Sequence, residues 1–253
     1  MFPFLWLLST SLKTPEEIFK IPPNILPEVF QWQNYKNATQ AIPFFRYFLN
    51  TFLLCFITIG GQLFSAPMVA YSLAKVQWKG RNIIFGIVVA TMILPAQVTM
   101  IPVYIIFSKL GWVNTYLPLT IGSFFGAPFF IFLLRQFFMG IPNELLDAAR
   151  IDGASEFRIY WQIMLPLVKP ALATVVLFQF VWTWTDFLGP LIYLNDPIKW
   201  TITVGLQGFL QDHNAQWELL MAAAAIFTVP MILLYFFGQK YFMRAGSAMT
   251  GLK

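Results

Sequence analysis

The chain has 253 residues, of which 58% are hydrophobic and only 11% are charged, and its mean hydropathy is +0.67. A soluble globular domain usually carries about 25% charged residues, so this composition excludes that class and indicates a protein that lies in a bilayer. The net charge of +5 comes from basic residues scattered between apolar segments. Such scattering is typical of the loops of a polytopic protein and does not indicate nucleic-acid binding.

The sequence offers little material for a metal or catalytic centre. Its one cysteine, Cys55, lies in an apolar segment and cannot form an internal disulfide. Its one histidine, His213, lies among polar residues between two apolar segments, and we expect an ordinary loop residue there. No metal site and no catalytic residues are predicted.

Five segments are long and apolar enough to cross the hydrocarbon core, which takes about 20 residues. They are residues 47–73, 82–107, 116–138, 171–194 and 217–240. Residues 1–9 are apolar but too short, and we interpret them as the second half of a first span, either shortened or assigned a late start. The sequence therefore predicts an all-α polytopic membrane protein, with one transmembrane domain over residues 1–253 and six spans.

Lysine and arginine residues predict the orientation of these spans. Ten lie on the side that holds the loop near 74–81, the stretch 135–170 and the C-terminal tail, and six lie on the other side. We therefore expect the loop 139–170 and the C-terminus to be cytoplasmic.

Several predicted spans contain proline, which removes a backbone donor from a helix. Neighbouring helices or a water-lined cavity can satisfy the freed carbonyl groups in a membrane. We expect kinks that serve packing, or broken helices beside a transport path. The pair Gly122-x-x-x-Gly126 predicts a close helix–helix contact. The prolines concerned are Pro67, Pro95, Pro102, Pro128, Pro190 and Pro230.

The stretch from Ile141 to Pro170, IPNELLDAARIDGASEFRIYWQIMLPLVKP, predicts a short helix followed by a break. Asn143 can cap the helix, and Glu144 lies in the first turn, where the macrodipole favours an acid. Gly153 can adopt a positive φ and end the helix. Ser155 can then cap a second short turn before the chain returns to the membrane.

Two functions for this loop follow from its residues alone. A short helix flanked by small side chains, here Ala148 and Ala149, suits insertion into a groove on a partner protein. A helix that lies on the lipid headgroups is an equal alternative. The loop contains no nucleophile–base pair, and the chain has no Gly-x-x-x-x-Gly-Lys-Ser/Thr phosphate loop. The chain is therefore not expected to be an enzyme or to hydrolyse ATP.

The loop resembles the EAA loop of binding-protein-dependent ABC importers. The match consists of Asp147-Ala148-Ala149, then Gly153, then Ile163-x-Leu165-Pro166, with the family spacing throughout. Asp147 replaces the usual glutamate, which keeps the charge and shortens its reach. The resemblance implies a six-span ABC-importer permease fold in which 139–170 couples to an ATPase. It assigns this role to Glu144, Asp147, Ala148, Ala149, Asp152, Gly153, Ala154, Ile163, Leu165 and Pro166.

Further stretches resemble the maltose- and glycerol-phosphate-type sugar permeases, among them Ala70-Tyr71, Gly80-Arg81, Asn114-Thr115 and 132–138. This resemblance implies a subunit of the bacterial plasma membrane that works with a homologous second permease and two ATPase subunits. A solute-binding protein outside the cytoplasm would deliver the sugar. ATP and magnesium would be bound by the ATPase subunits, with no cofactor in this chain. Membrane lipid is the remaining partner, and no nucleic acid is expected.

Polar residues inside the fifth predicted span, 171–194, are candidates for the translocation path. Asp186 lies about fifteen residues into that segment, and an ionisable residue at such depth is a functional-site hypothesis by default. A structural hydrogen bond to another span is the alternative. Trp184, Thr185 and Gln179 are the further candidates. The family usually has Trp-Asn-Asp/Glu-Phe where this chain has Trp184-Thr185-Asp186-Phe187.

Two other functions are alternatives to an ABC-importer permease, and several cargoes are compatible with one. An ATP-independent secondary transporter would need several intramembrane acids or histidines, and a membrane-embedded enzyme would need paired catalytic groups. The cargo could be an oligosaccharide, a disaccharide or glycerol phosphate. Phosphate recognition favours arginine or lysine, and no span interior clearly holds one, so a neutral sugar is favoured.

Overall fold

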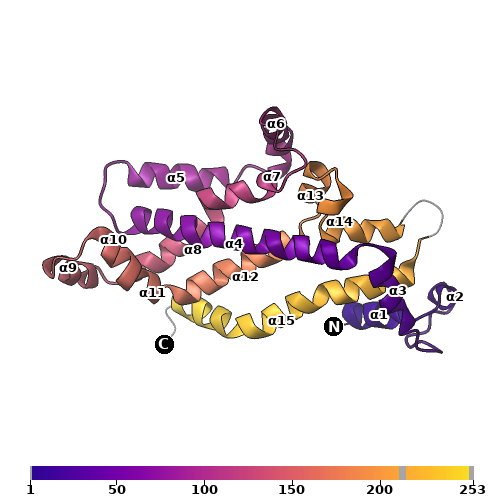
Figure 1. Ribbon diagram of the computed structural model, residues 1–253. Helices are drawn as coiled ribbons and strands as arrows, with labels where there is room; N and C mark the ends of the chain where they lie inside the picture. Colours follow the sequence, from indigo (N-terminus) through magenta and orange to yellow (C-terminus); the bar gives the residue numbers. More distant parts are fainter. Residues whose placement is uncertain (1, 211–214, 251–253) are drawn as a thin grey trace. The chain divides into compact units, whose positions relative to one another are not determined.

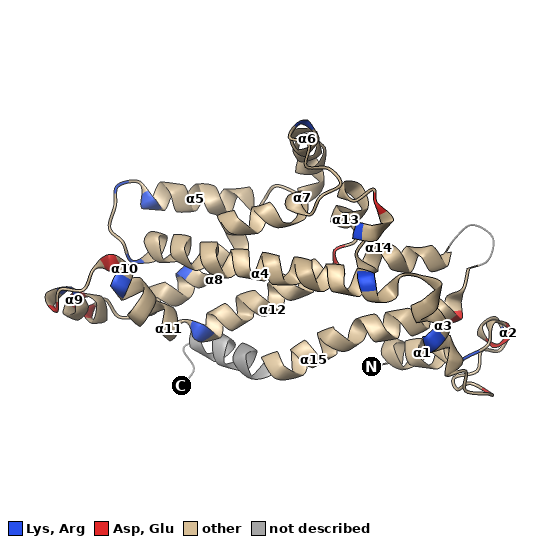
Figure 2. Cartoon of the chain, viewed as in Figure 1, with Lys and Arg blue, Asp and Glu red and all other residues tan. Residues whose placement is uncertain are grey.

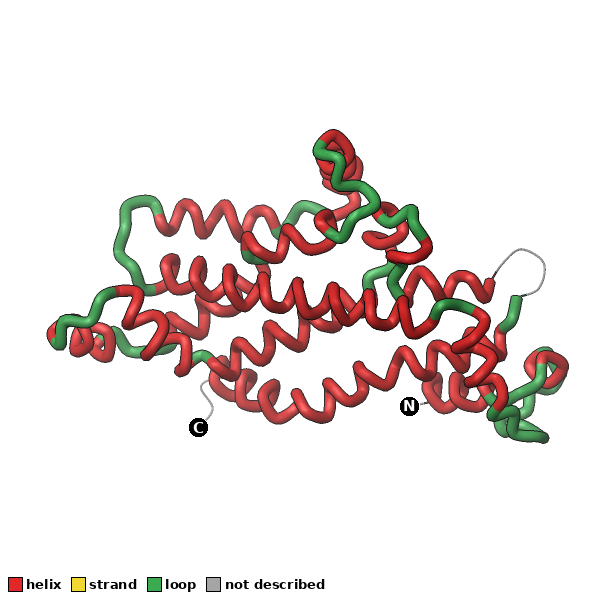
Figure 3. Tube along the Cα trace, in the orientation of Figure 1, coloured by secondary structure: helices red, strands yellow, loops and turns green. Residues whose placement is uncertain are grey.

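The computed structural model describes residues 2–210 and 215–250, with side chains as far as Gly238, so His213 lies outside the described residues. Every regular element in this part of the chain is helical (Figure 3). The chain divides into two compact units. Unit 1 contains the residues up to 53 and those from 184 to 236, and unit 2 contains 54–183 and the residues from 237 onward.

Unit 1 packs short helices against parts of two long ones (Figure 1). Its core is formed by apolar side chains from the N-terminal region, from α4 and α15, and from the residues near 202–209. The elements are α1 (Phe2–Ser11), α2 (Pro15–Ile18), α3 (Gln33–Ala41), α13 (Leu188–Tyr193), η3 (Pro197–Lys199), α14 (Ile202–Leu206) and η4 (Gln207–Leu210), with parts of α4 (Phe44–Ala74) and α15 (Trp217–Thr250).

The segment between α1 and α4 is folded onto the end of α1 through polar contacts. Lys13 is buried, donates a hydrogen bond to the carbonyl of Asn24, and lies 4.7 Å over the ring of Trp6. The side-chain amide of Asn34 donates to the carbonyls of Ser11 (3.1 Å) and Lys13 (2.9 Å). The bond to Ser11 satisfies one of the backbone carbonyls that α1 leaves free at its C-terminus.

Unit 2 packs its helices around one apolar core, which includes Tyr71, Phe130, Phe138, Leu146 and Tyr160. Its remaining elements are α5 (Arg81–Thr91), α6 (Ala96–Lys109), α7 (Leu117–Thr120), η1 (Ile121–Phe125), α8 (Pro128–Met139), α9 (Glu144–Ile151), α10 (Glu156–Arg158), η2 (Ile159–Met164), α11 (Leu165–Leu167) and α12 (Lys169–Thr185).

Within the described residues, three helical stretches are long and apolar enough to cross a membrane: Phe44–Ala74, Leu117–Met139 and Trp217–Gly238. Two bent pairs bring the number to five if each pair is one span. Along α4 and α12 the only charged residues are Arg46 and Lys169 (Figure 2). Charges gather instead at the α9–α10 segment, where α9 lies beyond the end of α4 (Figure 1).

The predicted segment 82–107 is not one helix. It forms α5 and α6, which meet at an angle of 98°. Pro95 stands at the break in extended backbone (φ −62°, ψ 136°), because proline supplies no amide and disfavours helical backbone in the residue before it. Segment 171–194 is also interrupted, since α12 ends at Thr185 and α13 starts at Leu188. Pro67, Pro102 and Pro230 are accommodated inside helices.

The predicted packing role of Gly122-x-x-x-Gly126 is wrong for one of the two glycines. A Cβ on Gly122 would have no heavy atom within 4 Å. Gly126 lies in the turn between η1 and α8, with φ +77°, and a Cβ there would lie 3.3 Å from the Cα of Ala66 on α4. The close approach to α4 therefore occurs at a turn that needs glycine, and not along a helix–helix crossing.

This difference generates a paired mutational test. Gly126→Ala forces a Cβ into left-handed backbone, which costs about 1–2 kcal/mol, and adds a tight contact with α4. We expect a lower thermal unfolding temperature in detergent. Gly122→Ala is the matched control and should unfold within a degree or two of the parent protein. Equal behaviour of the two variants would contradict the assignment.

Candidate functional site

The helix predicted in the loop forms as α9, yet its first turn is held differently from the expectation. Asn143 occupies the N-cap position, but its side chain makes no capping hydrogen bond. Its Oδ1 accepts from Nζ of Lys75 (2.7 Å), and the same ammonium donates to the carbonyl of Ile141 (2.5 Å). Lys75 follows α4 directly, and burial lowers its pKa, an effect that the nearby Glu144 opposes. The sequence-based capping role of Asn143 is therefore corrected to an anchor for Lys75.

The end of α9 is a Schellman turn, and the predicted positive φ at Gly153 is confirmed at +78°. The amide of Gly153 donates to the carbonyl of Arg150 (3.0 Å), and that of Ala154 donates to the carbonyl of Ala149 (3.0 Å). These two bonds satisfy carbonyls that the helix leaves free. Ala154 and Ala149 both belong to the core of unit 2, which supplies the apolar contact that accompanies this turn.

The chain then turns back through short helical pieces. Ser155 caps α10 as predicted, since its Oγ accepts from the amide of Arg158 (3.3 Å). Residues Ile159–Met164 form a π-helical turn, and the amide of Leu165 after it donates a hydrogen bond to the carbonyl of Tyr160. Ile163 and Leu165 pack against the core, and Pro166 is exposed in the first turn of α11.

Helix α9 has two apolar sides. Leu146 and Ala149, three residues apart, face the core and are 2% and 8% exposed. Leu145 and Ile151 are 45% and 87% exposed, and Ala148 between them is also exposed. The spacing of Leu145, Ala148 and Ile151 places them on one side of a helix, which we call the outer stripe of α9. The two adjacent alanines of the motif therefore have different environments.

Charged side chains join α9 to α10. Arg150 pairs with Asp147 (3.0 Å) and with Glu156 (2.8 Å), and the hydroxyl of Tyr71 on α4 donates to the other oxygen of Glu156 (2.9 Å). Both ion pairs are exposed enough to water that each contributes only about 0–1 kcal/mol to stability. Their geometric role is to link the outer side of α9 to α4.

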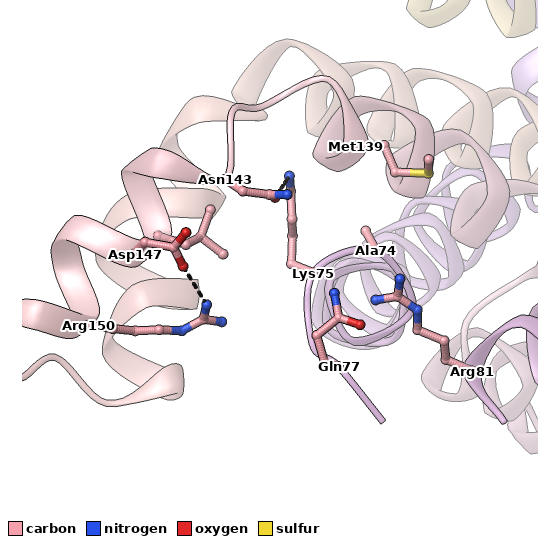
Figure 4. Close-up of a pocket in the computed structure, with 9 residues that line it drawn as sticks. Ala74, Lys75, Gln77, Arg81, Met139, Asn143, Asp147 and Arg150 are labelled. Carbon is pink, nitrogen blue, oxygen red and sulfur yellow. Dashed lines mark hydrogen bonds and ion pairs between the residues drawn. The ribbon is translucent and has the colours of Figure 1, made fainter. Parts of the chain in front are cut away.

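A pocket of about 400 Å³ lies between α9 and the end of α4 (Figure 4). Its wall carries three cationic side chains against one carboxylate, so it attracts anionic groups. None of its side chains forms a nucleophile–base pair, and the site is suited to contact and not to catalysis. The lining residues are Ala74, Lys75, Gln77, Arg81, Met139, Asn143, Leu146, Asp147 and Arg150.

The four candidates for the translocation path differ in burial and in the hydrogen bonds that they make. Trp184 is fully buried in unit 1, where its indole donates to the carbonyl of Phe227 (3.1 Å). Gln179 is buried in unit 2 and donates to Thr183 (2.9 Å), whose hydroxyl lies 2.9 Å from that of Thr58 on α4. Asp186 and Thr185 are therefore the two candidates that keep exposed surface.

Asp186 lies between α12 and α13 and takes part in two hydrogen bonds. Its Oδ1 accepts from the amide of Gly189 (3.0 Å), and its backbone carbonyl accepts from the hydroxyl of Thr203 (2.7 Å). The carboxylate thus satisfies an amide in the first turn of α13. Gly189 is only three residues away, so this contact is local in the chain.

Reasoning from sequence missed Tyr71, Lys75 and Glu156 as parts of the site. From the sequence, Lys75 is one of the basic residues of the loop near 74–81, which indicate only the orientation of the spans. The available clue is the spacing of Tyr71 and Lys75, which are four residues apart at the end of a long apolar helix and so share one face. Their partners in the loop lie 66 to 85 residues away in sequence, and no local pattern connects them.

Comparisons with known proteins agree with this architecture. Residues 66–245 match the family of the binding-protein-dependent transport system inner membrane component. The arabinooligosaccharides transport system permease protein AraQ of Bacillus subtilis is 34% identical over 100% of this chain and 90% of its own length. The diacetylchitobiose uptake system permease protein NgcG of Streptomyces coelicolor is 32% identical over 98% and 82%. The sn-glycerol-3-phosphate permease protein UgpE of Yersinia enterocolitica is 29% identical over 96% and 89%.

A solved structure gives the same result for the fold. A bacterial ABC transporter involved in the import of the acidic polysaccharide alginate contains a chain that superposes with a TM-score of 0.83 and 26% identity, covering 95% of this chain and 90% of that one. The fold is therefore that of an ABC-importer permease. This chain belongs to the family of inner membrane components of binding-protein-dependent transport systems, as its motif predicted.

The Schellman turn generates a prediction about the loop. Gly153→Val places a β-branched residue at φ +78° and should weaken the turn by about 1–2 kcal/mol or more. Limited trypsin digestion of the purified protein should then cleave faster at Arg150 and Arg158. Gly153→Asn should lie between Gly153→Val and the parent, because asparagine tolerates left-handed backbone better. Cleavage at the parent rate in Gly153→Val would contradict the structural role of this glycine.

Proposed function

We propose that this chain is a permease subunit of an ATP-driven importer for an oligosaccharide or disaccharide, and that α9 docks on a separate ATPase subunit. The observation that carries the docking proposal is the outer stripe of α9. Leu145, Ala148 and Ile151 are exposed on a helix whose other apolar side is already buried. Exposed apolar side chains of this kind suit a protein–protein contact.

The expected machine contains two permeases and two ATPases. ATP and magnesium would be bound by the ATPase subunits, a homologous permease would complete the path, and a binding protein would deliver the solute outside the cytoplasm. The basic residues after the C-terminal end of α4 and in the α9–α10 segment favour a cytoplasmic location for this side of the protein. Closure of the ATPase pair would move α9 and reorient the spans.

The cargo proposal draws on the relatives and on the described spans. AraQ is named for transport of arabinooligosaccharides and NgcG for uptake of diacetylchitobiose, and both cover this chain nearly end to end. Glycerol phosphate, for which UgpE is named, is the second candidate. The guanidinium of Arg135 on α8 stacks on Phe85 and its Nε donates to the carbonyl of Leu73, so it is engaged within the protein. This arrangement favours a neutral sugar over a phosphate ester.

We propose that Asp186 and Thr185 line the translocation path. Trp184 and Gln179 have a structural role instead. Asp186 is half-buried at a break between two helices, and Thr185 is exposed. Breaks in spans occur where backbone groups line a cavity. Trp184 instead donates to the carbonyl of Phe227 on α15, and Gln179 donates to Thr183 on its own helix, α12.

The docking proposal is tested by crosslinking. Because Ala148 is exposed and Ala149 is buried, a cysteine at 148 should crosslink to a cysteine on the ATPase groove in the assembled complex. A cysteine at 149 should crosslink at least about tenfold less, and it is the matched control. Both variants are made with Cys55→Ser, so that only the introduced thiol reacts.

Two results of this experiment have opposite meanings. A crosslink at Ala148 that depends on the ATPase cysteine supports docking through the outer stripe. An active complex in which Ala148→Cys gives no crosslink, while a cysteine elsewhere on the surface does, would rule that docking mode out.

The path proposal is tested at Asp186. Asp186→Asn keeps an oxygen that accepts from Gly189 but removes the charge, and Asp186→Ala removes both. If the carboxylate faces the cargo, both variants should take up labelled arabino-oligosaccharide about tenfold more slowly, a change of about 1.4 kcal/mol, at normal membrane abundance. Uptake at the parent rate by Asp186→Asn would limit Asp186 to its hydrogen bond with Gly189. Labelled glycerol 3-phosphate, run in parallel, distinguishes the two cargoes.

A further inference from the structure

Two side chains at the end of α4 are buried although both are polar. Tyr71 is 5% exposed and Lys75 is 8% exposed. They are four residues apart, so they lie one helical turn apart on the same face. Burying a hydroxyl or an ammonium is unfavourable unless it is hydrogen-bonded, and both groups find their partners in the loop that follows α8.

The two side chains hold opposite ends of α9. Lys75 binds the start of the helix, through the carbonyl of Ile141 (2.5 Å) and Oδ1 of Asn143 (2.7 Å). Tyr71 binds beyond its end, through Glu156 (2.9 Å). Figure 4 shows Lys75 reaching from α4 toward Asn143. The helix is thus attached to α4 at two points and cannot pivot about either one alone.

The attachment extends to the outer side of α9. Glu156 accepts from Nε and Nη2 of Arg150, both at 2.8 Å, and Nη1 of Arg150 donates to Asp147 (3.0 Å). A continuous chain of charge-assisted hydrogen bonds, which are stronger than neutral ones, therefore runs from Tyr71 through Glu156 and Arg150 to Asp147. Asp147 is exposed on α9.

Apolar packing alone would not fix this geometry. Leu146 and Ala149 pack in the same core as Tyr71, but apolar contact is non-directional and tolerates sliding. Hydrogen bonds weaken steeply when they are misaligned. The polar contacts therefore set the position of α9 relative to α4, while the apolar contacts supply most of the attraction.

We infer that Tyr71 and Lys75 are positioning residues that convert a movement of α9 into a movement of α4. The inference rests on the proposed docking of α9 to an ATPase. It adds that α4 is the helix that receives the motion, and that two defined polar contacts transmit it. Neither residue touches the ATPase or the cargo in this account, because both are buried within unit 2.

The test uses the assembled complex in proteoliposomes, with a reporter on α4 that does not require the cargo. Gly60→Cys in a Cys55→Ser background carries a spin label, since Gly60 is exposed and a Cβ there would meet no heavy atom within 4 Å. The accessibility of this label to a water-soluble relaxation agent is measured with and without ATP and magnesium. The rate of ATP hydrolysis is measured in the same samples.

Tyr71→Phe removes one hydroxyl, and Lys75→Met removes the ammonium at similar length. We expect both to copurify with the ATPase and hydrolyse ATP at the parent rate, while the ATP-dependent change at the label shrinks about tenfold, as loss of a buried hydrogen bond to a charged group implies. Lys75→Arg keeps a cation with several donors and should restore most of the change.

Tyr160→Phe is the matched control. Tyr160 is also buried, its ring lies 5.3 Å from that of Tyr71, and its hydroxyl makes no hydrogen bond to the residues that the structure describes. It should behave as the parent does. A loss of signal in Tyr160→Phe equal to that in Tyr71→Phe would overturn the inference, because any change in the core would then have the same effect.

Two further outcomes would also overturn it. In one, Tyr71→Phe and Lys75→Met keep the full ATP-dependent change. In the other, they no longer copurify with the ATPase, which would make them part of docking. Failure of the proposed function is distinguishable, since it would leave the parent protein without a crosslink at Ala148 and without an ATP-dependent change at Gly60.

Discussion

The arrangement of the loop depends on a few hydrogen bonds between the end of α4 and a segment more than sixty residues later in the chain. Lys75 binds the backbone before α9, and Tyr71 binds Glu156 after it. Helix α9 has eight residues, and a helix of this length is not stable alone in water. Its packing through Leu146 and Ala149 and its polar attachments give it a fixed orientation, and that orientation decides which of its side chains face outward.

The bilayer imposes the second constraint. Backbone groups in hydrocarbon must be satisfied inside the protein, and the prolines of this chain each remove one backbone donor. Pro67 and Pro102 lie inside helices, whereas Pro95 marks a bend of 98° between α5 and α6. Around the break that follows α12, Asp186 satisfies an amide of α13 and Thr203 satisfies a carbonyl. Interruptions of this kind let a helical protein present polar groups at depth, which a transport path requires.

Several polar side chains inside the two units form hydrogen bonds within the protein. Trp184 and Gln179 use their donors within the protein, and Thr58 and Thr183 join α4 to α12. Serine and threonine commonly connect membrane helices in this manner. A residue type that suits sugar binding, such as tryptophan or glutamine, is therefore not by itself evidence of a binding role, because the same groups serve packing between helices.

The sequence by itself determined the class of protein. Composition indicated a membrane protein, and the spacing from Asp147 through Gly153 to Pro166 identified the family. The positive φ at Gly153 and the cap at Ser155 were also predictable, because both depend on residues only a few positions apart. Tertiary structure alone decided that Ala149 is buried while Ala148 is exposed, and that Asn143 binds Lys75. These outcomes depend on which distant helix lies alongside, and one sequence contains no local signal for such a contact.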